Sequence, residues 1–262
     1  MSARSIVVNP RKLGLLGLAR EVARARRAGP GPETVFRLFR PFHGPALDEI
    51  FERVMADQTG RRILCEGRSL HPTLLDFDRL RALPDGTLGR EYVRFMESNQ
   101  IDIVSFAEAS LRHMAREDYA NDAVWTLVNR ARDIHELVHL VSGYGTDELG
   151  EMCELAFFIR EDPRPRASRL AIRINIAAFR RRGYSHSEAV IAEAFRRGSE
   201  AALLTGADWE GMMGWPLADV RESLGISEPP LYDPIPPTGE APKLRDLLRA
   251  AFVSDPGAGL PA

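Results

Sequence analysis

The sequence predicts an all-α fold, a single helical domain that contains a metal-binding helical hairpin. Apolar residues recur at intervals of three and four along most of the chain, which is the period of an amphipathic helix. Alternation with a period of two, typical of half-buried strands, is nearly absent. Two histidines four residues apart, followed by a glycine turn and a second helical pattern, predict the hairpin.

The helical segments follow one another with short interruptions. Helices are expected at 46–56, 87–98, 105–115, 118–141, from 146 onward, at 166–181, 185–204 and 215–224, and a short run at 61–65 is the one segment expected to be extended. Ser105 and Ser185 each precede a glutamate by three residues, as in a capping box. Gly143 and Gly145 stop the longest helix, and the acidic Asp147 suits the positive N-terminal end of the next one.

Composition excludes several classes of protein. Hydrophobic residues make up 44% of the 262 residues, enough for a sizeable core, and the net charge of −2 argues against a dedicated nucleic-acid-binding protein. Cys65 and Cys153 form no C-x-x-C motif and are too few for a disulfide scaffold, so reduced thiols are expected. No apolar run reaches the length of about 18 residues that predicts a membrane span.

The chain divides into three parts. Residues 1–45 form a basic N-terminal extension, and within residues 1–30 seven arginines and lysines flank a short apolar run. Such a segment is typical of a solvated extension, a helix lying on an anionic membrane, or a transit peptide. Residues 46–227 form the helical domain. Residues 228–262 form a proline-rich tail, either a linker or a strap along the surface, with a short helix expected at 243–252.

The segment 130–160 contains the candidate metal-binding residues. His135, Glu136 and His139 form an H-E-x-x-H pattern. On a helix the two imidazoles lie one turn apart on the same face, where they can bind one metal ion. His135 falls inside the predicted buried stripe of the helix and His139 at its edge. An unpartnered imidazole is costly there, so a polar group must meet both rings.

Glu151 is the natural partner of the two histidines. It lies twelve residues after His139, so an antiparallel hairpin brings it level with them, and Glu154 shares roughly its face. Two histidines and one or two carboxylates suit zinc, or magnesium or manganese with water completing the shell. We therefore expect a divalent metal, zinc first, bound by His135, Glu136, His139 and Glu151. The alternative is a pair of core histidines hydrogen-bonded to Glu151 without metal.

A zinc metalloprotease is a remote alternative, with Glu136 as its general base. Two features argue against it. The motif lacks the third histidine of the metzincins, and no strand is predicted upstream that could hold an extended peptide.

These residues resemble a known family. His135, the acid at 136, His139 and Glu151 resemble the H-D-x-x-H-x11-E signature of the Coq-four proteins of ubiquinone (coenzyme Q) biosynthesis. Residues 83–96 are similar to that family's L-P-x-G-T-x-G-x-x-Y-x-x-F-M, and residues 209–226 to its closing W-x(n)-P-L-x-x-x-R-x-x-L-x-I. The resemblance covers roughly residues 47–226. The chain departs from the family at 136, where Asp is usual, and at the loop 143–145, where the family has a proline.

The resemblance implies an all-helical protein that binds a divalent metal through this signature. It further implies peripheral membrane association, an apolar groove for a long isoprenoid, and a complex with other ubiquinone-biosynthesis enzymes. The implied reaction removes the carboxyl group from carbon one of a polyprenylated hydroxybenzoate, with hydroxylation at the same carbon. We expect a metal-dependent decarboxylase in which Glu136 and Glu154 move protons. The apolar residues near the signature that would line the groove are Val138, Val141, Met152, Leu155 and Phe158.

The main alternative is a non-catalytic, lipid-binding scaffold that organises a ubiquinone-biosynthesis complex around a structural metal. An open coordination position favours the enzyme, and a closed four-ligand shell favours the scaffold. The expected partners are a prenylated aromatic substrate and other pathway enzymes, with no nucleic acid, and whether the chain forms a homodimer stays open. The expected location is the cytoplasmic face of the inner membrane in a bacterium, or the matrix side of the mitochondrial inner membrane in a eukaryote.

Overall fold

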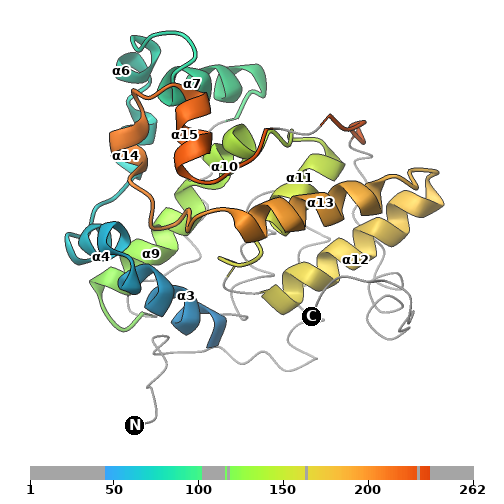
Figure 1. Cartoon of the computed structure of the whole chain (residues 1–262), viewed down its shortest axis with the longest axis horizontal. Coiled ribbons are helices and arrows are strands. Elements are labelled where there is room, and N and C mark those ends of the chain that lie inside the picture. Colours follow the sequence, from blue (N-terminus) through green and yellow to red (C-terminus); the bar gives the residue numbers. More distant parts are fainter. Residues whose placement is uncertain (1–44, 102–115, 117–118, 163–164, 229–230, 237–262) are drawn as a thin grey trace.

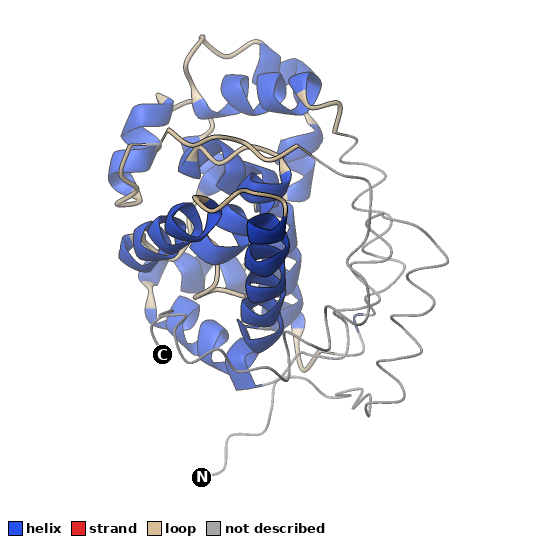
Figure 2. Cartoon of the chain, turned by 90° about the vertical axis from the view of Figure 1, so that its right-hand side faces the viewer, coloured by secondary structure: helices blue, strands red, loops and turns tan. Residues whose placement is uncertain are grey.

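The computed structural model describes residues 45–101, 116, 119–162, 165–228 and 231–236. The all-α prediction is confirmed, because these residues form helices joined by short loops (Figure 2). Within these ranges the β-type pairing is limited to an isolated bridge between Thr87 and Pro216. Among the described helices, none is both long and apolar enough to cross a bilayer. The basic segment 1–44 and the helices predicted at 105–115 and 243–252 lie outside the described residues.

One end of the molecule is built from α3 (Pro45–Ala56), α4 (Gln58–Cys65) and α9 (Asp122–Asp133), and α4 packs against the other two (Figure 1). The expectation that residues 61–65 are extended is wrong. The carboxylate of Asp57 accepts a hydrogen bond of 2.7 Å from the N–H of Gly60, which starts α4 just upstream. Ile63 and Leu64 are buried on this helix. In the sequence, a short buried apolar run has too few residues to show whether its period is that of a helix or of a strand.

A second group of helices surrounds α10 (His135–Ser142). Both α7 (Leu88–Ser98) and α15 (Leu217–Ser223) contact α10 and each other. The short α5 (His71–Leu75) and α6 (Phe77–Arg81) were not anticipated, and α6 packs on α7. The remaining short helix of this end is α14 (Trp209–Met212) (Figure 1).

The other side of the molecule is a layer of three helices, α11 (Glu148–Phe157), α12 (Pro165–Arg181) and α13 (Ser187–Glu200) (Figure 1). α11 packs against both α12 and α13. α13 is shorter than the predicted 185–204. The first turn of α13 begins at His186, because its carbonyl accepts hydrogen bonds from the N–H groups of Ala189 and Val190. The predicted capping bond from the side chain of Ser185 is not formed.

The helix predicted at 118–141 is divided at Ile134 into α9 and α10. The hydrogen-bond ladder continues through the division, because the N–H of Ile134 donates to Arg130 at 3.0 Å and the N–H of Val138 donates to Ile134 at 2.8 Å. The division makes His135 the first residue of α10. The buried apolar residues divide near the same point, with α9 in a smaller cluster beside α3 and α4, and α10 in the larger one.

A fully buried arginine, Arg130, ties α9 to the segment around α14. Its guanidinium donates to both carboxylate oxygens of Glu210, at 2.6 and 3.0 Å. It also donates to the carbonyls of Ala207 at 2.8 Å and Arg68 at 3.2 Å. These charge-assisted bonds join the two hydrophobic clusters across their boundary.

Candidate metal centre

The site lies on the hairpin of α10 and α11. Gly143 ends α10 with a φ of +79°, a left-handed conformation that glycine adopts without steric cost. Asp147 then starts α11, because its Oδ1 accepts hydrogen bonds from the N–H groups of Leu149 and Gly150. The two helices contact each other, so the predicted hairpin is present, while metal binding by it stays a prediction.

The hairpin brings together the four residues that the spacing predicted as ligands. His135, Glu136 and His139 each offer one ligand atom, and these atoms lie within 4.8 Å of one another. Oxygens of Glu151 lie 3.6 Å from Nε2 of His139 and 3.8 Å from Nε2 of His135. Two ligands of one tetrahedral zinc ion lie about 3.4 Å apart, since each zinc–ligand bond is about 2.0–2.1 Å long. The observed separations are close to that value and longer than a hydrogen bond.

His139 carries the clearest sign that a group is to be bound. Its Nδ1 lies 3.0 Å from the carbonyl oxygen of Tyr144, which can only accept, so Nδ1 bears the hydrogen. The lone pair is therefore on Nε2, which is buried and has no hydrogen-bond partner among the described residues. Burial lowers the pKa of His139 to about 4, so the ring is neutral at pH 7. A neutral imidazole oriented by a carbonyl is typical of a metal ligand.

His135 is held from its other side. Its Nδ1 lies 3.4 Å from Oε1 of Glu154, a carboxylate that is itself buried. Burial acts to lower the pKa of His135, but the surrounding carboxylates, Glu154 first, outweigh it and raise this pKa to about 10. Burial likewise acts to raise the pKa of Glu154, and the charge of His135 reverses this and lowers it. Glu154 therefore orients the imidazole, with Nε2 directed toward Glu151.

The remaining carboxylates are under mutual repulsion. Burial raises the pKa of Glu136. It also raises the pKa of Glu151 to about 7, with further contributions from Glu154 and Glu136, although the side chain of Glu151 keeps 41% of its surface exposed. A cation placed among these oxygens favours their charged forms. The donor set thus fits a divalent ion in both chemistry and charge.

Two groups at the site were missed by sequence reasoning. The carbonyl of Tyr144 is one, because a backbone acceptor in a loop leaves no signal in the residue type. The second is Tyr92 of α7, which is fully buried and whose hydroxyl has no hydrogen-bond partner within the described ranges. Burial, and then the charges of Glu136 and Asp133, raise the pKa of Tyr92. The motif around Tyr92 was noted in the sequence, but nothing there connected it to the histidines.

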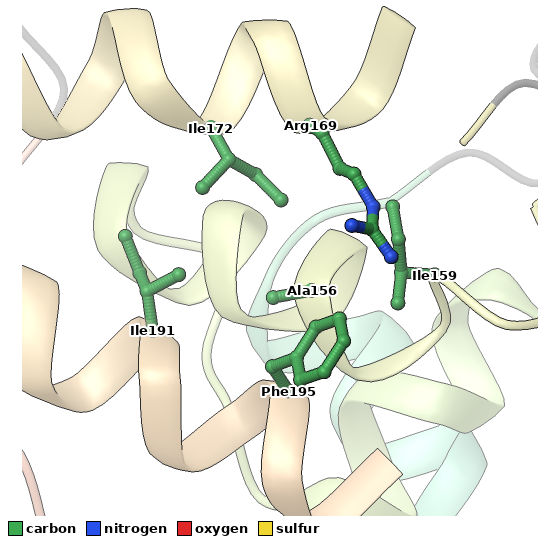
Figure 3. A pocket seen from close by; sticks show the side chains of 6 residues that line it. All are labelled: Ala156, Ile159, Arg169, Ile172, Ile191 and Phe195. Carbon is green, nitrogen blue, oxygen red and sulfur yellow. The ribbon is translucent and has the colours of Figure 1, made fainter. Parts of the chain in front are cut away.

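The predicted lipid groove stays a prediction. Val138 and Val141 are fully buried core residues, and Met152, Leu155 and Phe158 are partly buried against the same core. A recess does occur between α11, α12 and α13 (Figure 3), but its volume of about 10 Å³ is room for roughly one water molecule. An isoprenoid there would require the helices to separate. The residues that line this recess are Ala156, Ile159, Arg169, Ile172, Ile191 and Phe195.

Comparison with known proteins gives a consistent result. Residues 40–230 match the family described as "Coenzyme Q (ubiquinone) biosynthesis protein Coq4". A relative from Danio rerio, "Ubiquinone biosynthesis protein COQ4 homolog, mitochondrial", is 29% identical over 189 residues, which cover 71% of this chain and 66% of the relative. The Rattus norvegicus relative of the same name is 30% identical, over 69% of this chain and 66% of the relative. The chain thus spans just under two thirds of the length of these relatives.

A solved structure has the same fold. It is the crystal structure of a protein from Nostoc punctiforme described as a ubiquinone biosynthesis protein, and it matches with a TM-score of 0.62. The match covers 82% of this chain and 97% of that one, at 20% sequence identity. At this identity the likeness concerns the arrangement of helices.

Proposed function

This chain belongs to the Coq4 family of coenzyme Q (ubiquinone) biosynthesis proteins, and from this premise we propose that it removes a ring carboxyl group in a metal-dependent step of that synthesis. The substrate would be a polyprenylated hydroxybenzoate, decarboxylated at carbon one. The observation that carries the proposal is Nε2 of His139, a buried lone pair without a hydrogen-bond partner beside the carboxylate of Glu151.

The proposed ion would be held by His135, His139 and Glu151, with zinc as the first choice. A bound divalent ion supplies Lewis acidity and an affinity for the substrate carboxylate and its neighbouring phenol oxygen. Glu154 fixes the orientation of His135 through Nδ1. Three protein ligands leave a fourth position for substrate, as in catalytic zinc sites.

Glu136 is the proposed proton donor. It lies beside both histidines, so its carboxyl group is within reach of a substrate held at the proposed ion and can pass on a proton there. When the bond between ring carbon one and the carboxyl group breaks, CO₂ leaves and the electron pair stays on the ring carbon. The proton of Glu136 then takes the vacated position. In an oxidative variant, dioxygen would accept two electrons and water would supply the hydroxyl group at this carbon, so that CO₂ and hydrogen peroxide leave.

The scaffold alternative has one observation in its favour. The ligand atoms of Glu136 and the two histidines lie within 4.8 Å of one another, close enough for Glu136 to be a fourth ligand. With Glu151 this would close a four-ligand shell, which is the pattern of a structural zinc site. The two functions therefore differ in whether Glu136 binds the ion or donates a proton to the substrate.

Complementation tests the proposed function. In cells that lack their own Coq4 protein, wild type should restore ubiquinone and remove its carboxylated precursor, as measured by mass spectrometry. His135→Ala and Glu151→Ala should each lose at least about 100-fold in this activity, because each removes a proposed ligand. Glu200→Ala, on the exposed surface of α13 where Glu200 pairs with Arg196, is the matched glutamate control and should behave as wild type. If the two site variants restore ubiquinone as well as wild type does, the scaffold function replaces the enzyme.

We also propose peripheral contact with an anionic membrane, on the cytoplasmic face in a bacterium or the matrix face in a mitochondrion, where the substrate's isoprenoid tail would reside. The outward side of α12 carries Arg166, Arg173 and Arg181, all exposed and without an ion pair to another described residue. In contrast, Arg180 near the end of α12 pairs with Glu188, and Arg182 just after the helix pairs with Glu148. A row of unpaired arginines is suited to phosphate headgroups.

Vesicle flotation tests this contact. If each arginine contributes about 1 kcal/mol near an anionic surface, replacing Arg166, Arg173 and Arg181 by glutamine should weaken binding by about two orders of magnitude. The effect should be largest at low salt and absent with zwitterionic vesicles. Arg196→Gln on α13 is the control, since this arginine is already paired with Glu193 and Glu200. Binding that ignores salt and survives the triple substitution and deletion of residues 1–28 would contradict the electrostatic contact.

A further inference from the structure

A short segment after residue 230 lies against the hairpin loop of the candidate metal centre. The family match ends at residue 230, whereas the described chain continues through 231–236, which we call the C-terminal strap. The strap reaches the loop between α10 and α11 (Figure 1). Its Ile235 is fully buried although it stands between two prolines, so the strap is packed onto the body at this point.

The strap is bonded to the loop at both backbone and side chain. The hydroxyl of Tyr232 donates to Oδ2 of Asp147 at 2.6 Å and accepts from the N–H of Gly145 at 2.8 Å. The N–H of Ile235 donates to Oδ1 of Asp147 at 2.8 Å, and its carbonyl accepts from the N–H of Glu148 at 2.9 Å. Both oxygens of the carboxylate that starts α11 are therefore held by the strap.

The loop that the strap holds is also the loop that orients His139. The carbonyl of Tyr144 receives the hydrogen of Nδ1, and the ring of Tyr144 packs against the ring of Tyr232 with centroids 5.8 Å apart. Tyr232 thus contacts residue 144 through its ring and residues 145 and 147 through its hydroxyl. Asp147 in turn fixes the first turn of α11, which carries Glu151.

The hairpin leaves space for the hydroxyl of Tyr232 to approach its loop closely. A Cβ atom at Gly150 would lie 2.0 Å from the carbonyl oxygen of Gly145 and 2.8 Å from the hydroxyl of Tyr232. Glycine at 150 therefore leaves the space in which the loop and the tyrosine hydroxyl meet. A linker that only ran along the surface would not require a glycine at 150 to make room for its tyrosine hydroxyl.

We propose that Tyr232 is a positioning residue for the metal centre and that the strap is part of the structure that holds His139 and Glu151 at the proposed ion. The inference rests on the metal binding proposed above, and it adds residues that lie beyond the matched family region. Tyr232 acts through two neighbours. It keeps the carbonyl of Tyr144 in line with Nδ1 of His139, and it keeps the carboxylate of Asp147 in place at the start of α11.

The test compares Tyr232→Phe with Tyr184→Phe in the full chain. Tyr184 precedes α13, and its hydroxyl makes no hydrogen bond with another described residue, so it is a matched control. Zinc affinity is measured by competition with a chelator. Tyr232→Phe should weaken zinc binding about 10-fold, the lower end of the range for groups that orient ligands, and Tyr184→Phe should leave it unchanged. Hydrogen exchange of the Leu149 and Gly150 amides should become faster in Tyr232→Phe, while α13 stays unchanged.

A third measurement reports on the imidazole itself. Nitrogen NMR of His139 in the metal-free protein shows which ring nitrogen carries the hydrogen. In Tyr232→Phe a fraction of the rings should lose the Nδ1–H form, and Tyr184→Phe should keep it. Unchanged zinc affinity in Tyr232→Phe would overturn the inference. So would a loss of affinity accompanied by an equal increase in exchange throughout the protein, since that is general destabilisation.

The two proposals can fail separately. If wild type binds no divalent ion, the proposed function fails, and the His139 tautomer alone then decides the strap inference. An unchanged tautomer in Tyr232→Phe overturns the inference, and a changed one supports it. If wild type binds zinc and Tyr232→Phe binds it equally well, the metal centre stands without the strap.

Discussion

Replacing His139 by alanine should abolish stoichiometric zinc binding. The side chain is fully buried, its Nε2 has no hydrogen-bond partner, and its Nδ1 is fixed by a carbonyl. Changes to groups that only orient ligands cost about 10- to 100-fold in metal affinity, so loss of a ligand should cost more than about 100-fold. Bound zinc per chain, measured after dialysis by mass spectrometry of the metal, should fall from near one to near zero.

Two further variants separate the role of His139 as a ligand from its role in packing. His139→Gln retains a polar side chain in the core but lacks the imidazole nitrogen, so it should also lose zinc. Glu200→Ala should keep it, because Glu200 lies on the exposed surface of α13, where it pairs with Arg196. The thermal midpoint of each variant shows whether the fold is kept. Equal zinc content in wild type and a folded His139 variant would rule out the site.

The second large effect concerns stability. Arg130→Met should lower the free energy of unfolding by about 3–5 kcal/mol, because it leaves three backbone carbonyls without their donor and leaves Glu210 only the longer contact of 3.6 Å with Arg68. Urea denaturation followed by circular dichroism measures the change. Arg196→Met is the contrast, since Arg196 pairs with two glutamates on an exposed helix face, and its midpoint should stay near that of wild type.

A double substitution decides the cause of this loss. Arg130→Met with Glu210→Leu removes both charges, so much of the stability lost in the single variant should return. If the double variant is no more stable than Arg130→Met, the loss comes from packing of the long side chain. If Arg130→Met itself is as stable as wild type, the buried pair does not stabilise the fold.

The helices of the fold were largely predictable, because apolar residues at helical spacing mark a buried face wherever tertiary structure later places it. The errors have a common origin in contacts that are distant along the chain or set by backbone geometry. At 61–65 the apolar run was too short for its period to distinguish strand from helix, and Asp57 decided the outcome. The division at Ile134 lies inside an unbroken helical pattern, so no residue in the sequence predicted it.

The residues of the candidate site were predictable, but their burial was predicted wrongly: His139, expected at the edge of the buried stripe, is fully buried, and His135, expected inside it, keeps 32% of its side chain exposed. Spacing alone placed His135 and His139 on one face and Glu151 opposite them, because a hairpin with a short loop fixes the register of its two helices. The groups that orient these side chains were not predictable in this way. The carbonyl of Tyr144 and the hydroxyl of Tyr232 reach the site through a loop conformation and through a segment more than eighty residues away.

The separation of the buried residues into two clusters has a consequence for cooperativity. Apolar burial stabilises only the helices that share it, so α3, α4 and the start of α9 form a unit that can open without disturbing α10 and α11. The Arg130–Glu210 pair is a polar connection between the two units. When that connection is weakened, the amides of α3 and α4 should become labile well before those of the hairpin. The unfolding transition would then broaden into two steps, with His135 and His139 still assembled in the intermediate.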